Sequence, residues 1–340
     1  MSRSFFIPFL LLVFGGFVLS LQAEEVELQV ILKNGTKGGE GSAEKVRAFA
    51  LEKQMIPLSV GEIGPVRGSF RLPKVEAPNG LPILLQVTYG GVNYNKIVPP
   101  VPMMRAQPQE ITVYEKTQDR SSIKTKSLLQ ITRSKDALIA FKVFILHNNS
   151  IPPRSFQNDA DPLEIFVPSE ATDVSAQLTQ GAGMGIPLQL RPGKQGWILD
   201  RPILPGTSQL YVSYSIPASN LASVTFKDKL LFEKNDGERV VFAKPKDMEL
   251  SFVGAKNLKK LEADVPEDVK AYSVAYSAPR QEVTISVSGG QAVESFSSDQ
   301  ERNIENGKIF ISAEKTLLGV VAVLGLLFTL SFLFAYRKHP

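Results

Sequence analysis

The residues that most often carry acid–base chemistry are scarce in this chain. His147 and His339 are its two histidines, and it has no cysteine. A catalytic base needs a nucleophile and an orienting group within hydrogen-bond reach, and nothing around His147 suggests either partner. We therefore interpret His147 as a strand-end surface residue. The missing cysteines exclude thiolate catalysis, and two histidines cannot form a histidine-rich metal centre within one chain.

Two loops have the composition of a ligand site without its full pattern. Residues 180–187, "QGAGMGIP", are glycine-rich, but a phosphate-binding loop must lead from a strand into a helix. A strand-like segment follows here, which favours a hairpin loop. Residues 157–164 carry Asp159, Asp161 and Glu164, whose carboxylates are ligands that calcium prefers, in a spacing that lacks the calcium-loop pattern. A solvated acidic loop is the favoured interpretation, with calcium as the alternative.

Several aromatic residues could form a sugar-binding platform. The candidates are Trp197, Tyr211, Tyr214, Tyr272 and Tyr276. Aromatic residues in β proteins more often pack in the core or against a neighbouring strand, and we favour that interpretation. Carbohydrate binding remains the alternative function.

Two further patterns say little about the function of the protein. Asn34-Gly35-Thr36 and Asn148-Asn149-Ser150 fit the N-glycosylation signal, which we interpret as chance matches. A glycoside hydrolase would need two carboxylates paired in space, and the sequence selects no such pair. We therefore predict a non-enzymatic protein with no catalytic, cofactor-binding or metal-binding residue.

The charge distribution excludes nucleic acid as the partner. The formal net charge is +4, but Arg3, Arg337 and Lys338 belong to the terminal segments, which leaves 35 basic against 34 acidic residues. The longest basic run is Lys259-Lys260. A phosphate-binding surface needs clustered cations that release counterions, so we expect no nucleic-acid binding.

Both ends of the chain point to a membrane. Residues 1–23 combine Arg3 with an almost unbroken apolar stretch, which predicts a cleaved signal peptide, with an uncleaved anchor as the alternative. Leu317 to Tyr336 is a run of 20 residues without a charge, and a helix of that length would span about 30 Å, the thickness of a bilayer core. Arg337 and Lys338 follow it, and positive residues favour the cytoplasmic side.

The segments that must position any site have the period of β-strands. Val26, Leu28, Val30 and Leu32 alternate with mostly polar residues, which predicts a half-buried strand. Gly90-Gly91 separates two alternating runs and can adopt the positive φ of a two-residue hairpin turn. We predict a hairpin there, with ligand binding by the glycines as the alternative.

The middle of the chain continues this pattern. Residues 122–133 and 137–150 predict a long hairpin that turns at 134–136, and the second run is apolar on both faces, as in a central strand. The pattern of residues 228–243 predicts another hairpin, with Asn235-Asp236-Gly237 as its turn. Outside the termini no segment keeps a 3.6-residue period over ten residues, so we expect no long helix.

The first β region resembles the carboxypeptidase-regulatory-like, prealbumin-type β-sandwich. The resemblance rests on a G-x-F strand followed by an aromatic hairpin, here Gly68, Phe70, Val87, Tyr89, Gly91 and Tyr94. The order of segments also resembles bacterial membrane-anchored proteins that join this domain to a second β domain and one transmembrane helix. The resemblance implies an accessory or binding role without catalysis.

We therefore expect an all-β fold of tandem β-sandwiches between a signal peptide and a transmembrane helix. The predicted parts are the signal peptide (1–23), the carboxypeptidase-regulatory-like sandwich (24–116), a second sandwich (117–245), a small β region that is a third domain or an extension of the second (246–293), a stalk (294–315), the transmembrane helix (316–336) and a cytoplasmic stub (337–340). The expected function is binding or scaffolding of another envelope component. We expect the bacterial inner membrane, with the body in the periplasm and the C-terminus in the cytoplasm.

Overall fold

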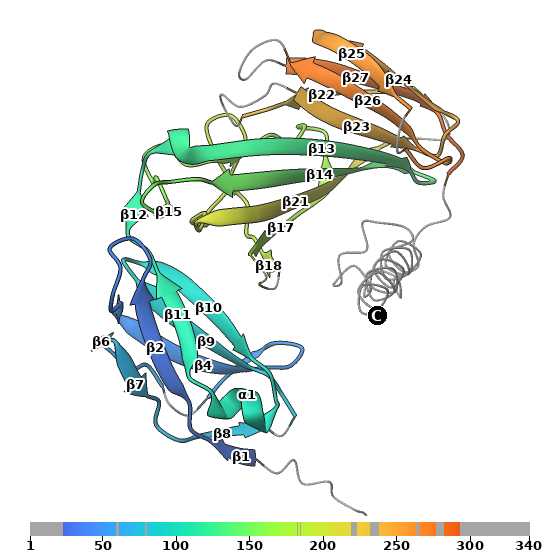
Figure 1. Ribbon diagram of the computed structural model, residues 1–340. Helices are drawn as coiled ribbons and strands as arrows, with labels where there is room; N and C mark the ends of the chain where they lie inside the picture. Colours follow the sequence, from blue (N-terminus) through green and yellow to red (C-terminus); the bar gives the residue numbers. More distant parts are fainter. Residues whose placement is uncertain are drawn as a thin grey trace, which may run out of the picture. The chain divides into compact units, whose positions relative to one another are not determined.

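The computed structural model describes residues 23–292, except for 59–60, 79, 182, 184, 219–222, 232–237, 263–264 and 277–281. This part of the chain is almost entirely β structure (Figure 1), which confirms the all-β prediction. Its helices are α1 (Pro102–Ala106) and the 3-10 helix η1 (Arg120–Ser122). The predicted stalk, transmembrane helix and stub, and nearly all of the signal peptide, lie outside the described residues.

The first group of strands, which we call the N-terminal β body, runs from residue 23 to residue 113. Its strands are β1 (Ala23–Val26), β2 (Gln29–Asn34), β3 (Ser42–Ala43), β4 (Lys45–Leu51), β5 (Met55–Pro57), β6 (Val66–Arg67), β7 (Ser69–Arg71), β8 (Val75–Pro78), β9 (Ile83–Tyr89), β10 (Val92–Val98) and β11 (Gln109–Val113). They form a four-stranded sheet in the order β10-β9-β4-β5, a three-stranded sheet in the order β11-β2-β7, and the pairs β1-β8 and β3-β6.

The N-terminal β body has its own hydrophobic core. The alternation predicted from residue 26 is confirmed, because Val26, Leu28, Val30 and Leu32 are all buried in that core. The predicted single strand is divided into β1 and β2, which pair with β8 and with β7 and β11 respectively. The division lets one short segment contribute to two sheets while its side chains keep facing the same core.

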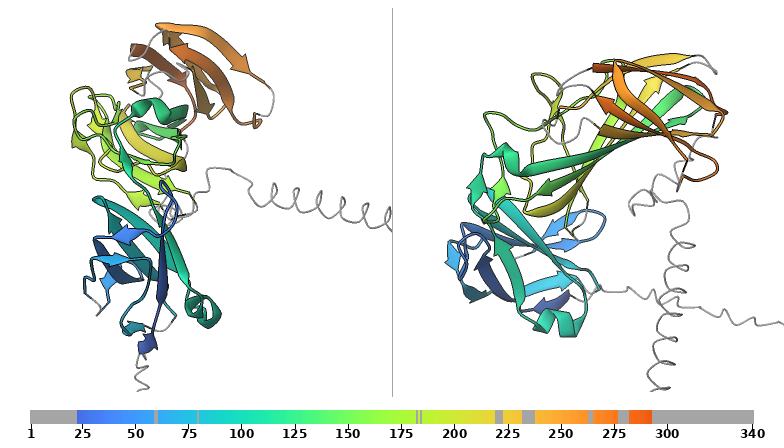
Figure 2. Two further views of the ribbon diagram at one scale, coloured as in Figure 1. Left: turned by 60° about the vertical axis from the view of Figure 1, so that its left-hand side comes forward. Right: turned by 45° about the horizontal axis from the view of Figure 1, so that its top comes forward.

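The second group, which we call the C-terminal β body, runs from residue 123 to residue 289. Its strands are β13 (Ile123–Arg133), β14 (Ala137–Asn148), β15 (Ser155–Phe156), β16 (Glu164–Ile165), β17 (Thr172–Gln180), β18 (Ile186–Pro187), β19 (Arg191–Pro192), β20 (Trp197–Ile198), β21 (Gly206–Pro217), β22 (Val224–Lys229), β23 (Glu238–Lys244), β24 (Met248–Val253), β25 (Ala255–Leu261), β26 (Lys270–Tyr276) and β27 (Glu282–Gly289). Figure 2 shows both groups of strands from two further sides.

An eight-stranded sheet dominates the C-terminal β body, in the order β18-β17-β21-β14-β13-β23-β26-β25. The predicted long hairpin is confirmed, since β13 and β14 pair antiparallel from Ile123↔Asn148 to Arg133↔Leu138 (Figure 1). Two three-stranded sheets, β22-β27-β24 and β16-β20-β19, complete the body. Residues of β24, β26 and β27 share one hydrophobic core with residues of β13 and β14.

The hairpin predicted for residues 228–243 is wrong. β22 pairs with β27 in the three-stranded sheet, whereas β23 pairs with β13 and β26 in the eight-stranded sheet. The proposed turn, 235–237, lies outside the described residues. Local alternation and a turn signal cannot show that two neighbouring runs belong to different sheets. Asp228 of β22 and Arg239 of β23 form an ion pair between those two sheets.

Candidate functional site

A buried ion cluster lies in the core of the C-terminal β body. Lys142 is on the core-facing side of β14, between Ala140 and Phe144, where the strand pattern predicts an apolar residue. Its Nζ lies 2.6 Å from Oδ1 of Asp228, which comes from β22 in another sheet. Arg239 of β23 pairs with Oδ2 of the same carboxylate. The three charged side chains have no exposed surface.

Aromatic and backbone groups complete the cluster. The Tyr276 hydroxyl donates to Asp228 Oδ2 at 2.6 Å, and Lys142 Nζ donates to the Phe166 carbonyl at 2.7 Å. Lys142 Nζ is also 5.2 Å from the centroid of the Tyr214 ring. Such hydrogen bonds and cation–π contacts compensate partly for the loss of water around a buried charge.

The cluster changes the protonation equilibria of its members. Burial lowers the pKa of the Lys142 amine to about 8, although Asp228 opposes that change. Burial would raise the pKa of the Asp228 carboxyl, but Arg239 and Lys142 outweigh it and hold that pKa below its usual range. The cluster therefore contains two cations and one anion near neutral pH.

A lysine of lowered pKa beside a carboxylate can act as a base or nucleophile when a substrate reaches it. Here the Lys142 amine and the Asp228 carboxylate are fully enclosed between strands of two sheets. The arrangement fits a structural role, in which the ion pairs link β14, β22 and β23. The sequence signal for it was a single lysine inside an apolar run, "ALIAFKVFIL".

A second polar cluster joins the two β bodies. The Tyr94 hydroxyl of β10 lies 2.9 Å from the Ser155 hydroxyl of β15 and donates to the Tyr114 carbonyl at 2.9 Å. The linker segment β12 (Lys116–Thr117) pairs in parallel with β15. Leu204 of the C-terminal β body packs against the core of the N-terminal β body.

Further contacts reinforce this junction. Thr36 Oγ1 donates to the Pro153 carbonyl at 2.5 Å and accepts from the Glu115 amide at 2.9 Å. The Glu115 carboxylate accepts from the Tyr89 hydroxyl at 2.6 Å and pairs with Lys37 at 2.8 Å. The hydrogen bond to Glu115 raises the pKa of Tyr89 to about 12. Backbone pairing, apolar packing and side-chain bonds thus all cross between the bodies.

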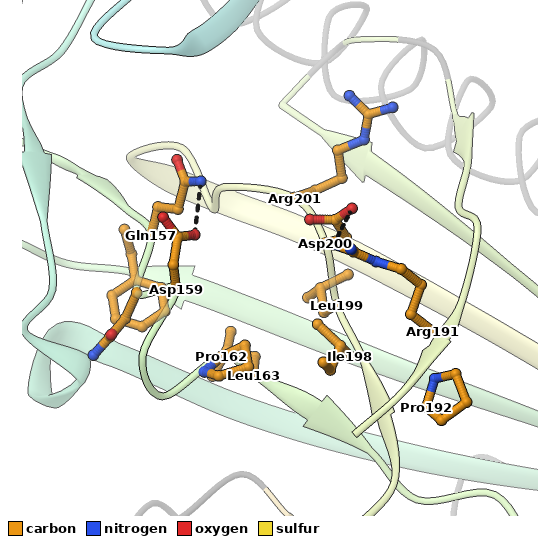
Figure 3. Close-up of a pocket in the computed structure, with 12 residues that line it drawn as sticks. Gln157, Asp159, Pro162, Leu163, Arg191, Pro192, Ile198, Leu199, Asp200 and Arg201 are labelled. Atoms are coloured by element: carbon orange, nitrogen blue, oxygen red, sulfur yellow. Dashed lines mark hydrogen bonds and ion pairs between the residues drawn. The ribbon is translucent and has the colours of Figure 1, made fainter. Parts of the chain in front are cut away.

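A pocket of about 410 Å³ opens beside β15 and the β16-β20-β19 sheet. Figure 3 shows its two polar sides: Arg191 is paired with Asp200 at 2.7 Å, and Gln157 donates to Asp159 at 3.1 Å. Its apolar lining includes Phe156, Leu163 and Leu199, all buried in the core. Both carboxylates already have polar partners, so neither is free to act on a ligand without breaking a contact.

The acidic loop does not bring its three carboxylates together. Asp161 pairs with Arg120 at 3.1 Å, and Asp159 accepts from Gln157. Glu164 accepts from the backbone amides of Lys194 and Gln195, at 2.9 and 2.8 Å. Among the described residues, no group of three or more histidine, aspartate or glutamate side chains is placed to hold a metal ion.

The other sequence candidates occupy structural positions. His147 lies one residue before the end of β14, as predicted, with Nδ1 3.1 Å from Thr207 Oγ1. Residues 181–185 connect β17 with β18, which pair antiparallel, so the predicted hairpin loop is confirmed. Asn34 and Asn148 are buried and hydrogen-bonded to backbone groups, which makes their side chains poor glycan acceptors.

The glycine turn holds a carboxylate of the protein itself. Gly90 and Gly91 have φ of +57° and +76° and connect β9 with β10, which confirms the predicted hairpin. Their amides donate to the two carboxylate oxygens of Glu44, at 2.8 and 3.3 Å. The turn therefore binds an anion, but that anion comes from the neighbouring chain segment.

The five aromatic candidates do not form one sugar-binding face. Tyr214 and Tyr276 are buried beside the ion cluster. Tyr272 and Trp197 are half-buried against the same core, and Tyr211 lies on the opposite face of β21 from Tyr214. The packing interpretation is thus correct for four of the five rings.

Comparisons with known proteins leave the family open. No family model matches the chain, and no curated protein matches it either. The resemblance to a carboxypeptidase-regulatory-like domain therefore stays a prediction from the motifs of the first β region. No helix among the described residues is long and apolar enough to cross a bilayer.

Proposed function

We propose that this chain is a non-enzymatic scaffold of a bacterial envelope, with tandem β-sandwiches that bind another envelope protein. In this proposal the uncharged segment 317–336 anchors the sandwiches to the inner membrane from the periplasmic side. Its length and the positive residues that follow it support that arrangement. The enclosed position of the Lys142–Asp228 pair supports a structural role for the most perturbed acid–base pair.

The observation that carries the proposal is the junction between the two β bodies. Domains joined by a plain linker move relative to one another unless their interface is large and well packed. Here Tyr94 and Ser155 are buried and hydrogen-bonded, and β12 pairs with β15. The described residues between 23 and 291 accordingly form one compact unit. A rigid pair of bodies can present binding surfaces in a fixed arrangement, which is the physical task of a scaffold.

The absence of cysteine makes this proposal straightforward to test. Spin labels on Lys53→Cys and Lys135→Cys, both in exposed turns of different bodies, should give one narrow distance distribution by pulsed electron resonance. The pair Lys135→Cys and Lys259→Cys lies within the C-terminal β body and gives the reference width. A distribution several times broader between the bodies than within one would overturn the rigid-scaffold function.

A further inference from the structure

Strand β14 is apolar on both of its faces, although only one face belongs to the core. Leu138, Ala140, Phe144 and Leu146 face the core, together with Lys142. Ile139, Phe141, Val143 and Ile145 alternate with them and face the other way, and each is half-buried. Antiparallel strands with one solvated face normally alternate apolar with polar residues, so this outer side departs from the pattern.

The strand register places neighbouring apolar residues side by side across four strands. Tyr211 is opposite Val143, Val143 is opposite Leu128, and Leu128 is opposite Val240. In the adjacent row, Gln130 lies between Phe141 and Phe242. We call Tyr211, Val143, Leu128, Val240, Phe141 and Phe242 the outer apolar face.

Within the described residues, this face belongs to neither hydrophobic core. Its six side chains are absent from both buried clusters and from the half-buried side chains that pack against them. Neighbouring apolar side chains on the outer side of a sheet can form a surface that another molecule covers.

Lysines border the outer apolar face. Lys126 is opposite Ile145, and Lys124 is opposite His147 at the same end of β13. Lys259 is opposite Ser273, which is itself opposite Val240, so it extends the central row. These three lysines form no ion pair with an acidic residue whose side chain the structure describes, although Glu238 begins β23 on the same side of the sheet as Val240. If a second copy of the chain bound through the same face, the lysines that border the two faces would lie close together. Like charges oppose such a contact.

We infer that the outer apolar face docks a partner protein whose own apolar surface is bordered by aspartate or glutamate. This inference rests on the envelope-scaffold function proposed above and adds the surface and the chemistry of its partner.

Photocrosslinking in the native envelope tests the inference on the full chain. We would place p-benzoylphenylalanine in place of Phe141 or Phe242, which preserves an aromatic ring, and in place of Val253 as the control. Val253 is 68% exposed and lies on β24, in another sheet. The expected result is one discrete protein adduct from both face positions and none from the control.

Charge reversal separates the docking face from other sources of an adduct. Lys124→Glu with Lys126→Glu should reduce the adduct yield by on the order of tenfold, whereas Lys53→Glu, on the N-terminal β body, should leave it unchanged. Reversing an acidic residue of the identified partner should restore it. A homodimer adduct, a lipid adduct, equal yields at Val253, or no effect of charge reversal would each overturn the inference.

The same experiment distinguishes this inference from the proposed function. Adducts that form only from positions outside the face, such as those around the Arg191–Asp200 pocket, would overturn the docking face and leave the scaffold function standing. No protein adduct from any surface position would contradict both.

Discussion

The hydroxyls of Tyr94 and Ser155 meet at 2.9 Å, although the two residues belong to different β bodies. Both are buried, with exposed fractions of 3% and 0%. The Tyr94 hydroxyl also accepts from the Tyr114 amide at 3.1 Å, so one oxygen joins β10, the start of the linker and β15. A buried polar group held by several partners fixes the geometry of the elements that supply them.

Tyr94→Phe should destabilise the protein by about 1–3 kcal/mol, because it leaves the buried Ser155 hydroxyl and the Tyr114 amide without their partner. Urea unfolding of residues 24–292 would measure the change. Tyr114→Phe is the matched control, since the Tyr114 ring lies 6.1 Å from that of Tyr94 and its hydroxyl has no hydrogen bond among the described residues. Equal effects of the two substitutions would contradict the special role of Tyr94.

Asp228→Asn should be the most damaging change in the ion cluster. It leaves Lys142 and Arg239 buried without a counter-charge, and breaking a buried ion pair costs about 3–5 kcal/mol. Lys142→Met removes the excess cation and leaves Asp228 paired with Arg239, so its expected cost is about 1 kcal/mol or less. Urea unfolding at neutral pH gives the comparison. The reverse order would show that Lys142, rather than Arg239, is the main partner of Asp228.

The lowered pKa of Lys142 predicts an alkaline gain in stability. Between pH 8 and 10.5 the unfolded chain binds the Lys142 proton more than the folded chain does, so the free energy of unfolding rises with pH. Relative to Lys142→Met, the wild type should gain roughly 3 kcal/mol across that window, at about 1.4 kcal/mol per pKa unit. The raised pKa values of Tyr214 and Tyr276 affect both proteins and largely cancel. If the difference in unfolding free energy between the wild type and Lys142→Met stayed constant with pH, the lowered pKa of Lys142 would be refuted.

In the turn between β9 and β10, the positive φ favours glycine more than any lack of room for a side chain does. A Cβ on Gly91 would have its nearest neighbour, Lys116 Nζ, at 3.8 Å, but φ is +76°. Gly91→Ala should therefore cost about 1–2 kcal/mol, and Gly91→Asn clearly less, since asparagine tolerates this region. Thermal unfolding of both variants would measure the effect. Equal losses would indicate crowding rather than strain.

Much of the fold could be predicted from period and turn chemistry. The β13–β14 hairpin and the Gly90-Gly91 turn follow from alternating apolar runs and residues that accept positive φ. These signals are local. The separation of β22 and β23 into two sheets depends on which distant strands compete for pairing, and no local pattern contains that information.

The polar clusters were harder to predict for a related reason. Lys142 falls on the core face of β14, where a lysine is acceptable only because Asp228 arrives from residues far along the chain. Tyr94 fits a hairpin aromatic, yet its partner Ser155 has no distinguishing neighbours in sequence. By contrast, the outer apolar face did leave a signal, because the two-sided apolar run around Phe141 is visible in the sequence alone.

The proposed function requires that the C-terminal segment hold the two β bodies outside a membrane. In the cysteine-free chain, Lys135→Cys and Lys338→Cys can be labelled separately with a membrane-impermeant maleimide in intact spheroplasts. We expect both variants to fractionate with the membrane. Lys135→Cys should be labelled in intact spheroplasts, and Lys338→Cys only after lysis. Labelling of Lys135→Cys only after lysis, or recovery of the full-length chain in the soluble fraction, would contradict it.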